Sequence, residues 1–184
     1  MPVTKQSIGF IGATSNIGLS LAQGVAHGNY RLLLFGRDSD EIEPIAKKIR
    51  GNTPNADIAI LECAHECSWE ADVIILDVSD NKLDEVLPNI RDVATQKIVV
   101  QLSSNPRREM ENRTHIIEKI HRELPHSKII HLGPTELLDS INESKKSGSL
   151  FISGDDNEAV QTVSEIIETA GFHPFVKNNI KEEI

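Results

Sequence analysis

The sequence predicts an α/β domain in which helices cover both faces of a doubly wound, mainly parallel sheet, a three-layer αβα arrangement. Three observations support this. Short apolar runs alternate with amphipathic segments through most of the 184 residues, a pattern that produces parallel strands joined by right-handed crossovers. Only 4% of residues are aromatic, so Ile, Val and Leu must build the core, as in a sheet buried on both faces. A glycine-containing turn joins the first strand to the first helix.

The expected elements alternate regularly in the first half of the chain. The first helix, Asn16–His27, has apolar side chains at helical spacing and ends at Gly28, a residue type that commonly terminates helices. Two further helices are expected between strands, over Glu41–Arg50 and Asn81–Asp92. The strands expected in this half are Ser7–Ile11, Tyr30–Phe35, Ala56–Leu61, Ala71–Leu76 and Lys97–Leu102.

The second half continues the pattern without a convincing domain boundary. The expected helices are Arg107–Glu123 and Glu158–Ala170, and the expected strands are Ser127–His131, Ser149–Ser153 and Phe172–Val176. The only linker-like patch is Lys145–Gly148, and the polar tail over residues 177–184 is expected to fray. Residues 1–184 are therefore expected to form a single domain.

Charge and composition exclude several classes of protein. The net charge of -9 and the pI of about 5.2 argue against nucleic-acid binding, which requires clustered Lys and Arg. The densest basic groups, Arg107-Arg108 and Lys145-Lys146, are interpreted as solvated surface. No apolar stretch approaches the roughly 20 residues of a membrane helix, and no secretory signal opens the chain. With only two cysteines, a reducing, cytoplasmic location is expected.

The strongest local signal is the turn from Gly12 to Gly18, which reads Gly-Ala-Thr-Ser-Asn-Ile-Gly between an expected strand and an expected helix. In this context Gly12 permits a tight turn and Gly18 lets the helix pack closely. The helix N-terminus then offers amide hydrogens and a partial positive charge to a pyrophosphate. These features predict a Rossmann-type nucleotide site. The expected pyrophosphate-binding residues are Gly12, Thr14, Ser15, Asn16 and Ile17.

Two positions modify this prediction. Ser15 stands where the motif usually has its middle glycine; its hydroxyl could donate to a phosphate or crowd it. At the end of the second strand, where an NAD-preferring site has an acid, the chain has Gly36 and Arg37. Gly36 leaves room, and Arg37 can form charge-assisted hydrogen bonds with a 2′-phosphate. These residues favour NADP over NAD, although Arg37 as a solvated loop residue is the alternative.

Other chemistries lack their residues. A short-chain dehydrogenase needs Tyr with Lys four positions later, but Tyr30 is followed at that position by Leu34. No Gly-Lys-Ser/Thr follows the turn, which argues against a P-loop nucleotidase. Neither the His residues nor the group Cys63, His65 and Cys67 matches a recognised metal-ligand spacing. No metal is therefore expected, no Ser-His-Asp triad is evident, and no catalytic residue is assigned.

The chain resembles the NADPH-dependent coenzyme F420 reductases. Members of that family typically have Gly-Gly-Thr-Gly-Asn-Leu-Gly at the turn and a Ser-Arg pair after the second strand, matching Gly12–Gly18 and Gly36-Arg37 here. The late segments Ser149–Val160 and Glu165–Pro174 resemble the family's Gly-Asp-Asp turn and its Gly-Phe-x-Pro ending. Two departures are Ser15 at the turn and His131–Thr135, which lacks the family's usual signature.

The resemblance implies hydride transfer between NADP(H) and a small redox acceptor, such as a flavin or the deazaflavin F420. It also implies a homodimer, and in family members a segment beyond the position of Val176 helps form the dimer and the acceptor pocket. At the carboxyl end of the fourth expected strand, Val78 and Ser79 would line the path from adenosine to nicotinamide. Ser103, Asn105 and Pro106, after the fifth, would border the nicotinamide. His131 could lie near the acceptor.

Two alternatives remain open from the sequence. The chain could bind NADP without catalysis and report it to a partner, as a sensor or scaffold domain. It could also be a Rossmann domain that has lost its nucleotide, which the replacement of the middle glycine by Ser15 would allow. Nucleotide titration distinguishes these readings.

Overall fold

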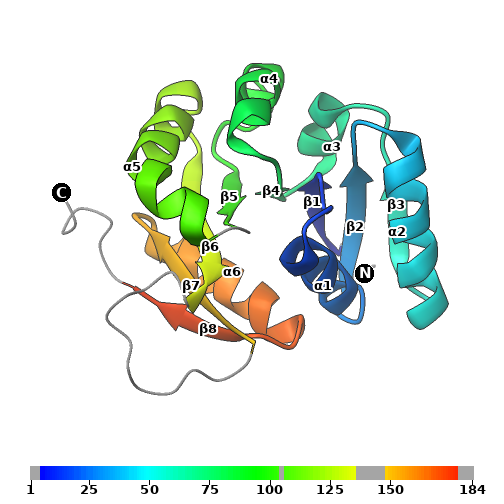
Figure 1. Ribbon diagram of the computed structural model, residues 1–184. Coiled ribbons are helices and arrows are strands. Elements are labelled where there is room, and N and C mark those ends of the chain that lie inside the picture. The colour runs from blue at the N-terminus through cyan, green and yellow to red at the C-terminus, as the bar shows by residue number, and fades with distance from the viewer. Residues whose placement is uncertain (1–4, 104–105, 136–147, 178–184) are drawn as a thin grey trace.

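A computed structural model describes residues 5–103, 106–135 and 148–177. In this part of the chain, eight strands form one sheet in the order β3-β2-β1-β4-β5-β6-β7-β8 (Figure 1). The strands are β1 (Gln6–Ile11), β2 (Tyr30–Phe35), β3 (Asp57–Ile60), β4 (Val73–Leu76), β5 (Ile98–Leu102), β6 (Lys128–Pro134), β7 (Ser149–Gly154) and β8 (His173–Val176). The predicted doubly wound, mainly parallel sheet is confirmed.

Six helices within the described residues cover the two faces of the sheet. They are α1 (Asn16–Val25), α2 (Ser39–Asn52), α3 (Ala64–Glu70), α4 (Asp80–Ile90), α5 (Pro106–Glu123) and α6 (Asn157–Thr169). Buried side chains of α1, α2 and α6 share one core, and those of α3, α4 and α5 share the other. Figure 1 shows α3, α4 and α5 above the sheet and α1 and α6 below it. None of the described helices has the length and apolar character needed to cross a membrane.

The strand order reverses between β1 and β4. From β1 the chain builds outward through β2 to β3, then returns to place β4 on the other side of β1. All pairings from β3 to β6 are parallel, so their carboxyl ends lie at one edge of the sheet. Helices leave in opposite directions on the two sides of this reversal, which opens a crevice there, the usual ligand position in such folds.

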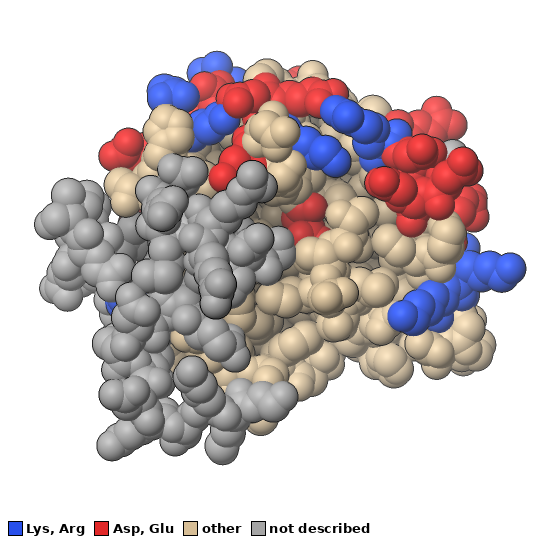
Figure 2. Space-filling view, viewed as in Figure 1, with Lys and Arg blue, Asp and Glu red and all other residues tan. Residues whose placement is uncertain are grey.

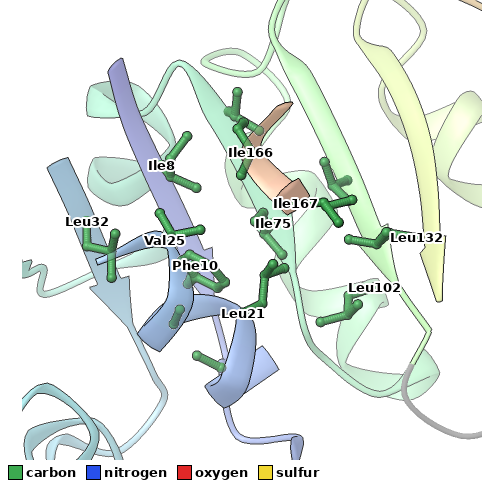
Figure 3. Packing of buried hydrophobic residues seen from close by; sticks show 14 of the residues in the cluster. Ile8, Phe10, Leu21, Val25, Leu32, Ile75, Leu102, Leu132, Ile166 and Ile167 are labelled. Atoms are coloured by element: carbon green, nitrogen blue, oxygen red, sulfur yellow. The ribbon is translucent and has the colours of Figure 1, made fainter. Parts of the chain in front are cut away.

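The core on the α1 face is made almost entirely of aliphatic side chains, with Phe10 as its large aromatic group (Figure 3). Leu21 and Val25 of α1 pack over Ile8 and Phe10 of β1 (Figure 3), and all four are fully buried. Side chains alternate along each strand between the two cores. Burial of this kind contributes roughly 1.5–3 kcal/mol for each large aliphatic or aromatic side chain, so the two cores fix α1 and its turn against the sheet.

The helix α1 also lies unusually close to α6. A Cβ atom added at Gly24 would overlap the backbone of Ala170, at the end of α6. Glycine at this position therefore permits the two helix backbones to approach. The contact joins the first helix of the chain to its last helix.

The structure departs from the sequence predictions at two places. Helix α3 was not expected, because its seven residues are too few to show a helical period. It is held by Lys97, whose ammonium group donates to the carbonyl oxygens of Ser68 and Trp69, each at 2.6 Å. Strand β7 runs antiparallel to β6, at the edge of a sheet whose pairings from β3 to β6 are all parallel. The predictions about Lys145–Lys146, the patch Lys145–Gly148 up to residue 147, and residues 178–184 fall outside the described residues.

Candidate functional site

The turn after β1 is shaped by close approach to β4. Gly12 has a φ of 106°, in the region that favours glycine, and its N–H donates to the Phe35 carbonyl at 2.8 Å. A Cβ at Gly12 would also overlap the backbone oxygen of Asp77. Ala13 follows with a φ of 55°. The tight turn predicted at Gly12 is thus present, and both backbone geometry and packing require glycine.

Ser15 begins helix α1 as its N-cap. Its φ is -74°, which any residue adopts, and its hydroxyl accepts a hydrogen bond from the Gly18 N–H at 2.9 Å. Capping of this type typically stabilises a protein by about 1 kcal/mol. Replacing the usual middle glycine therefore imposes no backbone strain. The Ser15 hydroxyl also lies close to the Asp77 carboxylate, so it is hydrogen-bonded within the protein.

Asp77 directly follows β4 and points its carboxylate at this turn. Its Oδ2 accepts a hydrogen bond from the Ser15 N–H at 3.0 Å, and only 5% of the residue is exposed. A Cβ at Gly18 would overlap Oδ2, so Gly18 makes room for the carboxylate as well as for helix packing. Burial raises the pKa of Asp77, while hydrogen bonds from Ser15 and Thr14 oppose the rise. An internal acid thus occupies part of the predicted phosphate cradle.

The other end of the crevice carries Arg37, just beyond β2. Its guanidinium donates to Glu85 of α4 at 2.6 Å, and the two side chains are 65% and 63% exposed. Gly36 lines the cavity and also has a packing role that was not predicted. A Cβ there would overlap Ile42 of α2, so this glycine admits the neighbouring helix. Arg37 is available to a ligand only if its bond with Glu85 is shared or broken.

A cavity of about 740 Å³ joins these two ends, within the size range of small-molecule sites. It lies at the carboxyl ends of β1 to β4, where the strand order reverses. Figure 2 shows charged side chains gathered along the upper edge, over α4 and its neighbours, and acidic atoms in the hollow below. Of the residues predicted to bind the cofactor, those that line the cavity are Gly12, Thr14, Ser15, Gly36, Arg37, Val78 and Ser79.

The remaining predicted residues lie elsewhere. Asn16 and Ile17 are in the first turn of α1, beside the cavity but not lining it. Ser103 is buried beyond β5, and Pro106 opens α5. Asn105 lies outside the described residues. The site predicted near the nicotinamide is therefore not joined to the main cavity in the described part of the chain.

Ser103 instead belongs to a buried polar group on the face covered by α5. The Gln101 side-chain oxygen lies 3.0 Å from His131 Nδ1 and accepts from the Ser103 hydroxyl at 3.4 Å. His131 is 1% exposed. The group lies where the carboxyl end of β5 pairs with the middle of β6, in the half of the sheet toward which a nicotinamide would extend in this fold.

Sequence reasoning missed the cavity residues contributed by α3 and α4. Lys82, Glu85, Val86 and Asn89 all line the cavity, and their spacing of three, four and seven places them on one helix face. The helical spacing could be read from the sequence, but the sequence did not indicate that this face of α4 points into the cavity. Cys63 and His65, considered only as metal ligands, line the cavity from the start of α3. Cys67 is buried in the core, where burial and nearby acids raise its pKa to about 12.

Comparison with protein families matches residues 7–105, more than half of the chain, to the NADP oxidoreductases described as coenzyme F420-dependent. The chain belongs to this family. The resemblance found in the sequence is confirmed, and with it membership in a family of NADP-dependent oxidoreductases. No curated protein sequence shows significant similarity to the chain.

Solved structures share the fold of this family member at low identity. An Arthrobacter sp. FB24 protein assigned as an F420-dependent NADP reductase is 16% identical, with a TM-score of 0.67 over 95% of this chain and 85% of that one. Plasmodium falciparum pyrroline carboxylate reductase with NADP bound is 18% identical, with a TM-score of 0.62 over 95% and 57%. A Myxococcus stipitatus imine reductase in complex with NADP+ is 17% identical, with a TM-score of 0.65 over 94% and 55%. The chain thus spans just over half of the last two.

Proposed function

We propose that the protein binds NADP(H) in the cavity at the carboxyl ends of β1 to β4 and transfers hydride to or from a flavin, the deazaflavin F420 or another small redox acceptor. The observation that carries the proposal is that one cavity joins the glycine turn after β1 to Arg37 after β2. These are the two places where a dinucleotide of this type needs hydrogen-bond donors and positive charge.

The chain offers suitable groups for each part of the nucleotide. In the described residues, the N–H groups of Asn16 and Ile17 at the start of α1 have no hydrogen-bond partner, so they are available to the pyrophosphate. Arg37, with Lys82 on the facing helix, supplies positive charge for a 2′-phosphate. Apolar side chains in the same cavity suit an adenine ring; they are Phe35, Val78 and Val86.

NADP(H) when bound supplies the hydride, so the protein's task is to hold two rings in contact and needs no side-chain nucleophile. The buried group of Gln101, Ser103 and His131 places hydrogen-bonded polar side chains at the end of β5 and in the middle of β6. It would border the acceptor side and keep that region polar.

Binding and turnover test the proposal in separate steps. Calorimetric titration is expected to give tighter binding of NADPH than of NADH, followed by oxidation of NADPH with FMN, FAD or F420, read as absorbance. Arg37→Ala should weaken NADPH by roughly tenfold, the size of a charge-assisted hydrogen bond at a surface, and leave NADH unchanged. Arg122→Ala, which removes an exposed arginine of α5, is the matched control. Equal loss for both nucleotides would contradict the role of Arg37.

A nucleotide sensor without catalysis is the second candidate, because internal acids already engage Arg37 and the Ser15 N–H. Such contacts hold the empty site in shape and would be exchanged when nucleotide binds. Binding of NADPH with no turnover against any of the three acceptors would support the sensor. Absence of binding by either nucleotide would contradict both candidates and support a fold that has lost its ligand.

A further inference from the structure

Asp77 places a carboxylate where the proposed site needs positive potential. Its Oδ2 accepts from the Ser15 N–H at 3.0 Å, directly before the Asn16 and Ile17 amides that are assigned above to the pyrophosphate. Gly12 and Gly18 are both confined by Asp77, one by its backbone and the other by its carboxylate. Asp77 therefore packs inside the turn and not against its outer surface. It directly follows the apolar strand β4.

A pyrophosphate carries two negative charges, and the start of a single helix offers only about half a positive charge. An ionised Asp77 already uses that potential and would repel a second anion at short range in a buried setting. A protonated Asp77 is neutral, and its O–H becomes a donor. The ionised carboxyl therefore disfavours pyrophosphate at the turn, whereas the protonated carboxyl favours it.

We propose, resting on the function proposed above, that the charge of Asp77 decides whether this turn accepts an anionic ligand. The nucleotide's pyrophosphate binds when the Asp77 carboxyl is protonated. Nucleotide and one proton therefore bind together. The proton comes from solvent and returns to it when the nucleotide leaves. Asp77 is a positioning and specificity-determining residue in this account, acting through the shape and charge of the turn.

The surroundings of Asp77 support protonation on binding. Burial raises the pKa of this carboxyl, against the hydrogen bonds from Ser15 and Thr14. A bound pyrophosphate would raise the pKa further, because a nearby negative charge disfavours ionisation. Linkage then requires that whatever raises the pKa on binding also makes binding weaker as pH rises.

The other charged or titratable groups around the cavity are exposed, whereas Asp77 is not. From the segment after β2 they are Arg37 and Glu41, from the start of α3 Glu62, Cys63 and His65, and from α4 Lys82 and Glu85. Exposed charges are screened by salt over about 8–10 Å. His65, which contacts Asp92 at 3.4 Å, is the histidine that lines the cavity and the competing source of a proton.

The experiment measures proton uptake directly. Calorimetric titrations of the full chain with NADP+ and with ADP-ribose, at constant pH in buffers of different ionisation enthalpy, give protons bound per ligand. ADP-ribose has a pyrophosphate but no 2′-phosphate, so its own charge is constant from pH 5 to 9. We expect net uptake approaching one proton for both ligands, and affinity falling by up to tenfold per pH unit above the carboxyl's transition.

Asp77→Asn keeps an oxygen acceptor for the Ser15 N–H and removes the ionisable group. It should bind both ligands at least tenfold more tightly than wild type at pH 8, with the proton uptake lost. Asp72→Asn removes the same charge at the other end of β4, where Asp72 accepts from the Ser7 N–H at 2.8 Å, and should retain the wild-type behaviour. His65→Gln should retain the proton uptake, whatever its effect on affinity.

Each outcome decides the matter. Uptake that persists in Asp77→Asn but disappears in His65→Gln would overturn the role of Asp77, as would binding in wild type that is independent of pH. An Asp77→Asn protein that binds no more tightly than wild type would make the carboxylate a structural cap only. If Asp77→Asn fails to fold, the proton uptake of wild type and of His65→Gln still tests the proposal. If neither wild type nor Asp77→Asn binds NADP+ or ADP-ribose at any pH, the function proposed above fails, and this inference fails with it.

Discussion

The two ends of the cavity each pair a group proposed to bind phosphate with an acid, but at very different depths. At the turn after β1, Asp77 is 5% exposed and accepts from a backbone N–H at 3.0 Å. At the far end, Arg37 and Glu85 meet at 2.6 Å with both side chains more than half exposed. The partners differ as well, since one is a fixed amide and the other a mobile side chain.

This difference teaches that depth, rather than the number of acids, sets how strongly each end opposes an anion. An exposed ion pair contributes about 0–1 kcal/mol and weakens with salt. A buried carboxylate is screened far less, so its charge is removed chiefly by protonation. The turn should therefore respond to pH, and the Arg37 end to ionic strength.

The largest expected effect comes from disturbing the close approach of Gly12 to the Asp77 backbone, at the buried end of the cavity. Gly12→Ala forces a Cβ onto the Asp77 backbone at a φ of 106°, and should lower the free energy of unfolding by about 2–4 kcal/mol. Denaturant titration measures this. Gly51→Ala, in a helical position with open space around it, should instead raise stability by about 0.5–1 kcal/mol. Similar effects of the two changes would contradict the account of the turn.

The second prediction concerns the stability of the empty protein. Because burial raises the pKa of Asp77 in the folded state, the folded protein holds this proton more tightly than the unfolded chain does. The resulting stability is fully present below the unfolded pKa and is lost as pH rises through the folded pKa. The free energy of unfolding of Asp77→Asn, minus that of wild type, should therefore increase from pH 4 to pH 8. A difference that stays level or decreases over this range would show that the depth of Asp77 has no energetic consequence.

The smallest effect belongs to the exposed end. Glu85→Gln frees Arg37 and removes a charge that would repel a 2′-phosphate, so NADP+ should bind about two- to fivefold more tightly at low salt. The gain should vanish in 1 M NaCl, where the screening length is about 3 Å, and NAD+ should show none. Glu168→Gln, an exposed acid on α6, controls for the change in net charge. A gain that survives high salt would remove the contrast between the two ends.

Much of the fold was predictable because its elements have strong periods. Tyr30–Phe35 was expected and found with the same bounds, since its apolar run lies between clear turn signals. The glycine turn was predictable for a similar reason: Gly12 has a local conformational requirement. The antiparallel pairing of β7 was not predictable, because orientation depends on a connection whose path the local sequence does not encode.

The predicted site was less complete because its decisive contacts join segments far apart in the chain. Asp77 contacts a turn 62 residues earlier, and Glu85 reaches Arg37 across 48 residues. Neither acid looks unusual in its own segment: one ends a strand and the other lies on a polar helix face. The packing role of Gly36 was hidden for the same reason, because the neighbour that requires a glycine there, Ile42, belongs to the next helix.

The close contact of α1 with α6 at Gly24 bears on how this domain could be reused. The matched family segment ends at residue 105, which on its own suggests a portable nucleotide module in the amino-terminal half. Yet the helix that carries the turn rests against Ala170, at the end of α6. Cutting the gene at the family boundary would uncover the α6-facing flank of α1. A transplantable unit must therefore include both halves, and shuffling between relatives should exchange α1 and α6 as a matched pair.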